Sequence, residues 1–578
     1  MNSAAASFHD DQLAAARAFA HTLIVVDDEA FTEPETSTPP VATELVKPGR
    51  QASVITSRAD KRPIAVPATR HPLDATSLIE TAMSLGLVCS VLRPRKGISP
   101  TDHVANASRK ADILCVDWEI HNDSGRTAVE IIKSVIAHDD EFGGRLRLIA
   151  IYTGIPERAK IFDSVLSGIP DATKKRRGIQ KRGNYIVSRD GLRIVWLLKT
   201  GGVTRKALAE NTVPESGLPE RLQNEFSYLS DGLLTNVALA TIASIRDATH
   251  HVLSQFQGRM DGPFFHHRSA IEIPAEAGDY AVSVVLSELK NVADMKGIAD
   301  KYAGEAALSR RIENMLGGKP SIDVNVSHSG KPQRTTLSVG NICLFVSQGS
   351  KASKAEITKS SPMDNGSYEK LPLLFFGSEK KAIEDTLRFA ILGSLKDYPS
   401  KIPRGAVPTL SLGTILKDRQ GRFYLCVQAS CDSVRIDKRT AFLLASLQKI
   451  PPKQLQENIL GRHSDHIIPI PKSNSGKVDF VGLALPRKPY TEIVAVPFDP
   501  NIATQTVQAT KSPSGSAWVF SASGALVSNA MLPRYKGPKE FVWVADLKKR
   551  RALKTVHLLA QSMGRLGYDE FEPLRKKN

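Results

Sequence analysis

Short apolar runs alternate with segments of helical spacing over the first third of the chain. The runs have the composition of buried strands and cover residues 22–26, 87–92, 113–116, 147–153 and 194–198. Between them, apolar residues recur every three or four positions, as they do along one face of a helix. This alternation predicts an α/β domain with a doubly wound parallel sheet, in which every strand ends at the same edge.

The pattern changes twice before the middle of the chain. Residues 31–71 are rich in proline and threonine and poor in large apolar groups, which predicts a loop inserted into the first domain, residues 1–205. Residues 206–330 return mostly to helical spacing. A helical region is therefore expected to follow the first domain.

Short strand-like runs dominate the rest of the chain. They lie within residues 331–545 and are separated by glycine, proline and aspartate, which favours a mainly antiparallel β domain. A lysine- and serine-rich stretch inside it, residues 349–370, is predicted to be a flexible polar loop. Residues 546–578 are expected to form a closing helix and a tail. The chain as a whole is thus predicted to be a multidomain α/β protein.

An apolar stripe at helical spacing marks the middle region. It consists of Leu234, Ala238, Ile242, Ile245, Thr249, Val252 and Phe256. His250 and His251 lie off this stripe, so both side chains are expected to be exposed. An exposed helical histidine can carry a phosphoryl group, but it is more often an ordinary surface residue. Whether either histidine has a chemical role stays open at this point.

Composition narrows the class of protein. Hydrophobic residues make up 41% of the chain and charged residues 24%, as in globular proteins, and the formal net charge is +17. No apolar run approaches the roughly 20 residues of a membrane helix, and the N-terminus lacks the basic start of a signal peptide. A cytoplasmic protein without membrane partners is expected. The basic run at residues 174–182 lacks interleaved aromatic residues, so it is read as a solvated loop, and a nucleic-acid partner is not favoured.

Polar side chains stand at the ends of four of the predicted strands. Asp27 and Asp28 follow the first strand, Asp117 the third, Thr153 ends the fourth, and Lys199 follows the fifth. Because parallel strands end at one edge of the sheet, these side chains should converge. Carboxylates brought together repel one another unless a cation lies among them. Hard divalent ions with oxygen ligands, Mg²⁺ or Mn²⁺, suit such a site.

A single reaction accounts for these residue types. Asp117, alone at the end of its strand, could attack a phosphoryl group and become an aspartyl phosphate. The metal ion would neutralise the phosphoryl oxygens. Lys199 could bind one of those oxygens, and the Thr153 hydroxyl another. The predicted chemistry is phosphoryl transfer to a protein carboxylate.

The N-terminal third resembles the receiver domains of two-component response regulators, which are CheY-like. Asp27 and Asp28 match the family's acidic pair, Asp117 its phospho-acceptor, Thr153 its hydroxyl residue and Lys199 its lysine. The resemblance implies a flavodoxin-like fold, a bound Mg²⁺ ion and a sensor histidine kinase as the phosphoryl donor.

Further positions extend the resemblance, and several others depart from it. It places a conformational-switch aromatic at Trp196 and a main-chain metal ligand at the carbonyl of Glu119. The family's usual proline four residues after the acceptor is His121 here, and the usual acid before Gly125 is Ser124. These departures concern the loop after Asp117 and leave the other matched positions intact.

The whole chain resembles the receiver-containing proteins of bacterial anti-phage two-component systems of the Detocs type. The resemblance rests on short motifs at residues 412–416, 425–428, 431–435 and 565–572. It implies a phosphate buffer or regulator that accepts phosphoryl groups from the kinase. A second receiver-bearing effector of the same operon is a further implied partner.

Two other functions remain open from the sequence. In the first, Cys431 is the nucleophile of an enzyme or effector site in the C-terminal region, paired with His463 or His466 and gated by the receiver. Nothing in the sequence places either histidine beside the thiol. In the second, the basic surface binds nucleic acid.

Overall fold

The protein divides into two compact units. Unit 1 comprises Met1–Ile322 and Leu337–Gly349, and unit 2 comprises Asp323–Thr336 and Ser350–Asn578. The computed structural model describes residues 6–31, 73–94, 100–200, 206–271, 274, 276–403, 405–460, 467–472, 479–486, 493–515, 517–523 and 537–564. The predicted insertion at 31–71 lies outside the described residues, except for Phe31.

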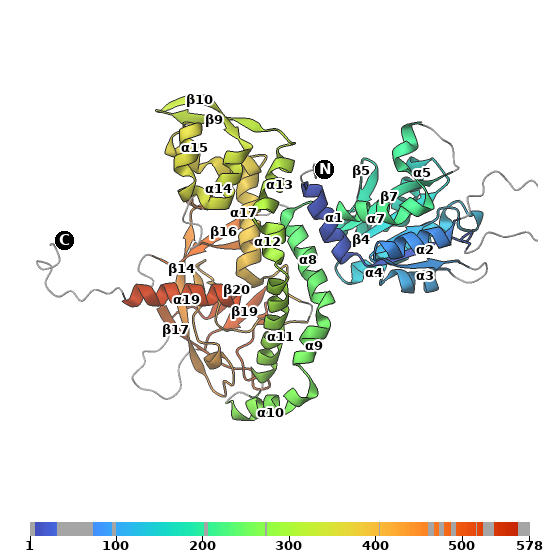
Figure 1. Cartoon of the computed structure of the whole chain (residues 1–578). Coiled ribbons are helices and arrows are strands. Elements are labelled where there is room, and N and C mark those ends of the chain that lie inside the picture. Colours follow the sequence, from blue (N-terminus) through green and yellow to red (C-terminus); the bar gives the residue numbers. More distant parts are fainter. Residues whose placement is uncertain are drawn as a thin grey trace, which may run out of the picture. The chain divides into compact units, whose positions relative to one another are not determined.

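A mainly parallel sheet forms the centre of the N-terminal part of unit 1 (Figure 1). Its strands, in spatial order, are β2 (Val88–Leu92), β1 (Thr22–Val26), β3 (Ile113–Val116), β4 (Arg147–Thr153), β7 (Leu192–Lys199), β6 (Tyr185–Val187) and β5 (Gln180–Arg182). The first five run parallel, whereas β6 and β5 are antiparallel additions at one edge. This is the flavodoxin-like doubly wound order, so the predicted parallel sheet is confirmed.

Helices cover both faces of this sheet. One face packs against α1 (Phe8–Phe19), α2 (Ala75–Ser84) and α7 (Leu218–Ser227), and the other against α3 (Pro100–Ser108), α4 (Arg126–Glu141) and α5 (Arg158–Gly168). Successive strand residues alternate between the two apolar layers, with Cys115 in one and Val116 in the other. Both sides of each central strand are therefore buried, which explains its unbroken apolar sequence.

A buried arginine fixes the helices and strands on one side of the sheet. Arg147, at the start of β4, is fully buried and binds Asp139 of α4 through two nitrogen–oxygen contacts of 2.7 Å. It also donates to the carbonyls of Ser108 and Ala111, both at 2.6 Å. A buried guanidinium with all these acceptors is well compensated for its loss of water. The contacts tie α3, α4 and β4 together.

The basic run at 174–182 is not a loop. Residues Asp171–Arg177 form helix α6, and Gln180–Arg182 form strand β5. Arg177 is buried and pairs with Asp190, and Arg176 pairs with Asp140. Much of this run is therefore ordered by acidic partners that lie elsewhere in the sequence and that its local pattern does not predict.

The middle region is mostly helical, as predicted, although residues 206–330 also contain strands β8 (Thr212–Val213) and β9 (Ser321–His328). Its helices after α7 are α8 (Leu233–Asp247), α9 (Thr249–Gln255), α10 (Asp261–Ala270), α11 (Glu276–Met295), α12 (Ile298–Ala303) and α13 (Glu305–Met315). Helix α14 (Val339–Ala352) lies beyond this region, in the part predicted to be mainly β. The predicted apolar stripe is wrong in phase, because Leu234 and Ile242 are 59% and 52% exposed. The buried face of α8 is instead formed by Leu239, Ala240 and Ala243, together with Asn236.

Unit 2 contains an antiparallel sheet, as expected. Its path is β15 (Ile468–Lys472), β16 (Asp479–Ala484), β14 (Thr440–Ile450), β13 (Phe423–Cys426), β12 (Thr414–Asp418), β20 (Glu540–Leu547), β19 (Trp518–Ser521) and β18 (Thr510–Lys511), with β11 (Leu395–Asp397) on β20 and β17 (Ile493–Phe498) on β14. Helices α17 (Glu379–Ser394), α18 (Pro452–Leu460) and α19 (Lys549–Gly564) accompany it. The face of α19 that is buried contains Ala552, Thr555 and Leu559.

Residues 349–370 are helical rather than a loop, which corrects the prediction. The end of α14 is followed by α15 (Lys354–Ser360) and α16 (Asn365–Glu369). Ile357 and Tyr368 are fully buried, and the Tyr368 hydroxyl donates to the carbonyl of Ser350 over 2.8 Å. These two apolar anchors order a segment whose lysines and serines suggested otherwise. The predicted β region therefore begins with helices and one hairpin, β9 (Ser321–His328) with β10 (Lys331–Ser338).

Candidate functional site

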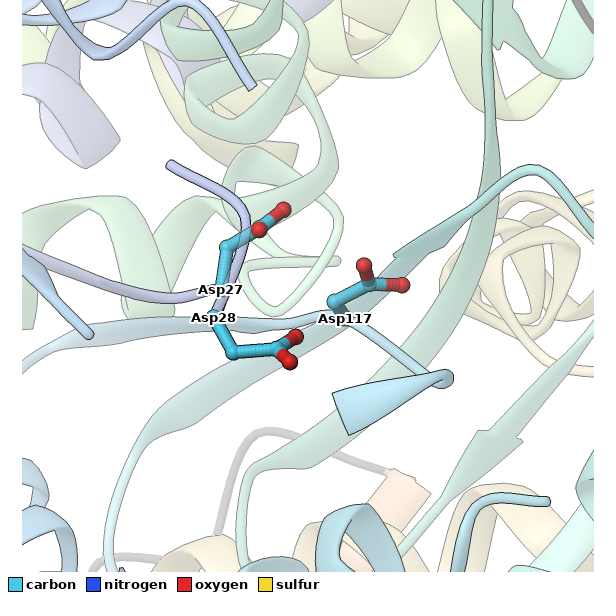
Figure 2. Close-up of side chains that lie close together, drawn as sticks. All are labelled: Asp27, Asp28 and Asp117. Carbon is cyan, nitrogen blue, oxygen red and sulfur yellow. The ribbon is translucent and has the colours of Figure 1, made fainter. Parts of the chain in front are cut away.

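Three carboxylates meet where β1 and β3 end (Figure 2). The main-chain N–H of Asp117 donates to the carbonyl of Val26 over 2.9 Å, and that of Asp27 to Leu92 over 3.1 Å. The sheet ladder therefore continues one residue beyond each strand and fixes both acids at its edge. One ligand atom from each of Asp27, Asp28 and Asp117 lies within 4.8 Å of the others. The structure thus brings together the acids that the sequence placed at strand ends.

Lys199 connects two of these acids. Its ammonium, at the end of β7, donates to Oδ2 of Asp27 over 2.7 Å and to Oδ2 of Asp117 over 2.9 Å. The lysine side chain is only 2% exposed. Burial alone would lower the pKa of Lys199, but the two carboxylates outweigh it and hold that pKa above its ordinary value. Lys199 is therefore a fixed positive charge inside the cluster.

The electrostatics of Asp117 leave room for a cation. Burial raises the pKa of Asp117, Lys199 opposes this, and the charge of Asp27 raises it further. Three carboxylates against one ammonium leave two uncompensated negative charges. Oδ1 of Asp28 is buried and makes no hydrogen bond to any part of the chain that the structure describes. This donor set fits a divalent ion with oxygen ligands.

The predicted main-chain ligand lies in the loop after Asp117. The carbonyl of Glu119 accepts a hydrogen bond from the N–H of Asn122 over 3.1 Å, which leaves a second lone pair on that oxygen. The N–H of Glu119 donates to Oδ1 of Asp117 over 3.3 Å. Burial, and next the charge of Asp117, raise the pKa of the Glu119 side chain.

The same loop has an unusual backbone. His121, Asn122 and Ser124 have φ angles of 57°, 55° and 57°, in the left-handed region that non-glycine residues seldom adopt. Gly125 (φ 84°) is the N-cap residue of α4, and a Cβ there would lie 2.1 Å from the ring of Trp118. The glycine that keeps its family spacing from Asp117 is thus required by the contact with Trp118.

Sequence reasoning missed the role of His121. Its main-chain N–H and its ring Nδ1 lie 2.9 Å and 3.0 Å from Oδ2 of Asp28. In the sequence, His121 stands out only because it lies where the family that the chain resembles usually has proline. The histidine four residues after Asp117 can be seen in the sequence, but the left-handed turn that brings it back to Asp28 cannot.

Thr153 and Trp196 share a partner. Thr153 ends β4, is fully buried, and its hydroxyl accepts from the N–H of Ile155 over 3.3 Å. Trp196 is 1% exposed, and its indole N–H donates to the carbonyl of Ile155 over 3.2 Å. The loop after β4 is therefore held both by the hydroxyl residue and by the predicted switch aromatic, which points into the core.

The segment that leaves the sheet contacts the same edge. The two-residue strand β8 (Thr212–Val213) runs parallel to the end of β7, with Val213 paired to Lys199. The hydroxyl of Tyr152 donates to the carbonyl of Val213 over 2.7 Å. The ring of Tyr152 in turn lies 5.7 Å from the Lys199 ammonium. The exit from the receiver-like part is thus bonded to the strand that ends in Lys199.

The other candidate residues do not join this cluster. His250 and His251 are exposed on α9, as predicted. Cys431 is exposed, and its thiol lies 3.4 Å from a carboxylate oxygen of Asp432, a contact that raises the pKa of Cys431 and disfavours the reactive thiolate. His463 and His466, its possible partners, lie outside the described residues.

Comparison with known proteins identifies the part that carries the cluster. Among the helices that the structure describes, none is both long and apolar enough to cross a membrane. A search of curated proteins and a search of solved structures found no match to this chain. Residues 19–204 match the family model of the response receiver domain. The match, the strand order and the acidic cluster together support a CheY-like receiver in this part of the chain.

Proposed function

We propose that this protein accepts a phosphoryl group on Asp117 from a partner histidine kinase, with Mg²⁺ or Mn²⁺ held by the acidic cluster. The observation that carries the proposal is the buried contact of Lys199 with both Asp27 and Asp117, beside Oδ1 of Asp28, for which the described part of the chain supplies no hydrogen-bond donor. An incoming phosphoryl group needs a nucleophile, a positive charge for its oxygens and ligands for a cation, and these side chains supply all three. The wider receiver match supports a phospho-accepting, response-regulator-like role.

The transfer would proceed by displacement at phosphorus. A carboxylate oxygen of Asp117 forms the new P–O bond as the P–N bond of a kinase phosphohistidine breaks, and the imidazole leaves with the electron pair of that bond. Asp27, Asp28 and the Glu119 carbonyl would hold the cation, whose charge stabilises the phosphoryl oxygens in the transition state. Lys199 would bind one phosphoryl oxygen, and the Thr153 hydroxyl another.

Phosphorylation of the full chain tests this directly. Incubation with a small acyl phosphate and Mg²⁺ should produce one added phosphoryl group, visible by intact mass and on phosphate-affinity gels. Chelation of the metal or Asp117→Asn should abolish it. Asp163→Asn is the matched control, because this carboxylate is exposed on α5 and lies outside the cluster, and it should label like the parent. Equal labelling of Asp117→Asn would disprove the assignment.

The proposed cellular setting is narrower than the receiver match. We place the protein in a bacterial anti-phage two-component system, as a buffer or regulator of phosphoryl flow from the sensor kinase. This rests on the short motifs in the C-terminal half of the sequence. Cells carrying the kinase, its operon and this protein should change their phage plating efficiency when Asp117 becomes Asn. An unchanged efficiency in cells that still phosphorylate the parent protein would remove the defence role and leave the phospho-acceptor intact.

A further inference from the structure

Two donors of one residue hold one oxygen of Asp28. The main-chain N–H of His121 lies 2.9 Å from Oδ2 of Asp28, and the ring Nδ1 lies 3.0 Å from the same atom. Both side chains are largely buried, with 19% and 14% exposed. A ring nitrogen that faces a carboxylate oxygen at this distance carries the proton and donates it. The contact therefore fixes the rotamer of Asp28 from one side.

The rest of Asp28 is fixed in a complementary way. Its main-chain carbonyl accepts from Nε of Arg93 over 2.8 Å. Its other carboxylate oxygen, Oδ1, is buried and has no hydrogen-bond donor among the described residues. One oxygen is thus bound by His121, and the other, which faces no donor among the residues that the structure describes, can bind a ligand. Hydrogen-bonded carboxylates of this kind are typical of metal sites.

We propose that His121 is a positioning residue for the cation site: it holds Asp28 so that Oδ1 binds the divalent ion. The inference rests on the proposed function, because it concerns the same cation. It assigns to this chain a device that proline at the same position could not supply. Proline lacks the N–H and the ring donor, and its φ near −65° excludes the left-handed backbone of His121.

Substitutions at His121 can separate the effect of its side-chain hydrogen-bond donor from that of the rest of the residue. Nδ2 of asparagine stands as many bonds from Cα as Nδ1 of histidine, and asparagine tolerates a left-handed backbone. His121→Asn should therefore keep the contact with Asp28. His121→Gly removes the ring donor, keeps the main-chain N–H and relieves the backbone strain. Asn122→Gly adds the same backbone freedom to the loop at an exposed neighbour whose φ is 55°.

The test is calorimetric titration of the full-length chain with MnCl₂, without any phosphoryl donor. His121→Gly should bind Mn²⁺ about tenfold more weakly than the parent, as is usual when a partner of a metal ligand is removed. His121→Asn and Asn122→Gly should bind like the parent. The Tm of metal-free His121→Gly should be no lower than that of the parent, because a strained residue has been replaced by glycine.

Each outcome separates this inference from the function on which it rests. If the parent does not bind Mn²⁺, the proposed cation site fails and the role of His121 fails with it. If the parent binds and His121→Gly binds equally well, only the role of His121 is overturned. A lower Tm of metal-free His121→Gly would make the residue a structural one. If His121→Asn loses affinity as His121→Gly does, the hydrogen bond from the ring is not what matters.

Discussion

Lys199 joins two buried acids that would otherwise repel each other. We expect Lys199→Met to lower the free energy of unfolding by about 3 kcal/mol, because removing one partner leaves buried charge uncompensated. Burial raises the pKa of Asp117 and Lys199 opposes it, so the variant raises that pKa further. An acid whose pKa is higher in the folded protein than in the unfolded chain contributes less to the stability of the protein as the pH rises.

The loss in Lys199→Met should therefore be larger near pH 8 than near pH 5. Urea unfolding of unit 1, followed at both pH values, measures it. Lys175→Met removes an exposed lysine of α6 and serves as the control, with little change expected. Equal losses at the two pH values would show that the charge of Lys199 is not the cause.

Asp546, on β20 in unit 2, gives a second pH dependence. Burial raises its pKa from 3.8 to about 6, and Trp543 donates to one of its oxygens over 3.2 Å. The contribution of Asp546 to stability is full below about pH 4 and is lost as the pH rises through about 6. The loss amounts to about 3 kcal/mol, since each pKa unit corresponds to about 1.4 kcal/mol.

Denaturant unfolding of unit 2 between these pH values should show this decline in the parent. The side chain at this position in Asp546→Asn cannot ionise. Between the same two pH values, the free energy of unfolding of this variant should therefore fall by about 3 kcal/mol less than that of the parent. Parallel pH profiles of the two proteins would show that Asp546 titrates normally.

At the scale of elements, the loop between β3 and α4 depends on the close contact between Gly125 and the ring of Trp118. A Cβ on Gly125 would lie 2.1 Å from the Trp118 ring, at a φ of 84°. Gly125→Ala should destabilise unit 1 by about 3 kcal/mol, the sum of overpacking and backbone strain. Gly143→Ala is the matched control, since Gly143 has a φ of 80° and nothing within 4 Å of an added Cβ.

Only the strain should remain at Gly143, about 1 kcal/mol. Thermal and chemical unfolding of the two variants measures the difference. Equal losses at both positions would mean that the Trp118 ring moves aside without cost.

The strands and their terminal acids were predictable because both signals are local. An apolar run such as 147–153 needs no partner to be recognised, and parallel topology then places Asp27 and Asp117 at one edge. Helix faces were harder. On α8 the exposed side contains Leu234 and Ile242, so hydrophobicity alone selected the wrong face. Which face packs is decided by neighbours distant in the sequence.

The same limit applied to other segments. Residues 349–370 are ordered by two buried anchors, which a lysine- and serine-rich composition hides. His121 reaches Asp28 only through a left-handed backbone, a conformation that residue type does not announce. Local pattern therefore predicted which acids meet at the sheet edge but not the conformation of the loop beside them.

At the scale of the whole molecule, the two compact units make a testable division of stability. A ligand that binds only folded unit 1 stabilises that unit alone, by about 2.7 kcal/mol at a hundred times its Kd. Differential scanning calorimetry should resolve two transitions, and Mn²⁺ should raise only one of them. Asp28→Asn should abolish that shift. An equal rise of both transitions would contradict independent unfolding of the units.

The pairing of Val213 with Lys199 has a consequence for control from a distance. β8 and the acidic cluster share the end of β7, and Tyr152 is bonded to the same exit segment. If occupancy of the site at Asp117 changes the free energy of this pairing, the coupling is reciprocal. A molecule that binds the helices after β8, without touching the acids, would then change the affinity of the site for its ligand. Occupancy of the site would change the affinity of the helices for that molecule by the same factor.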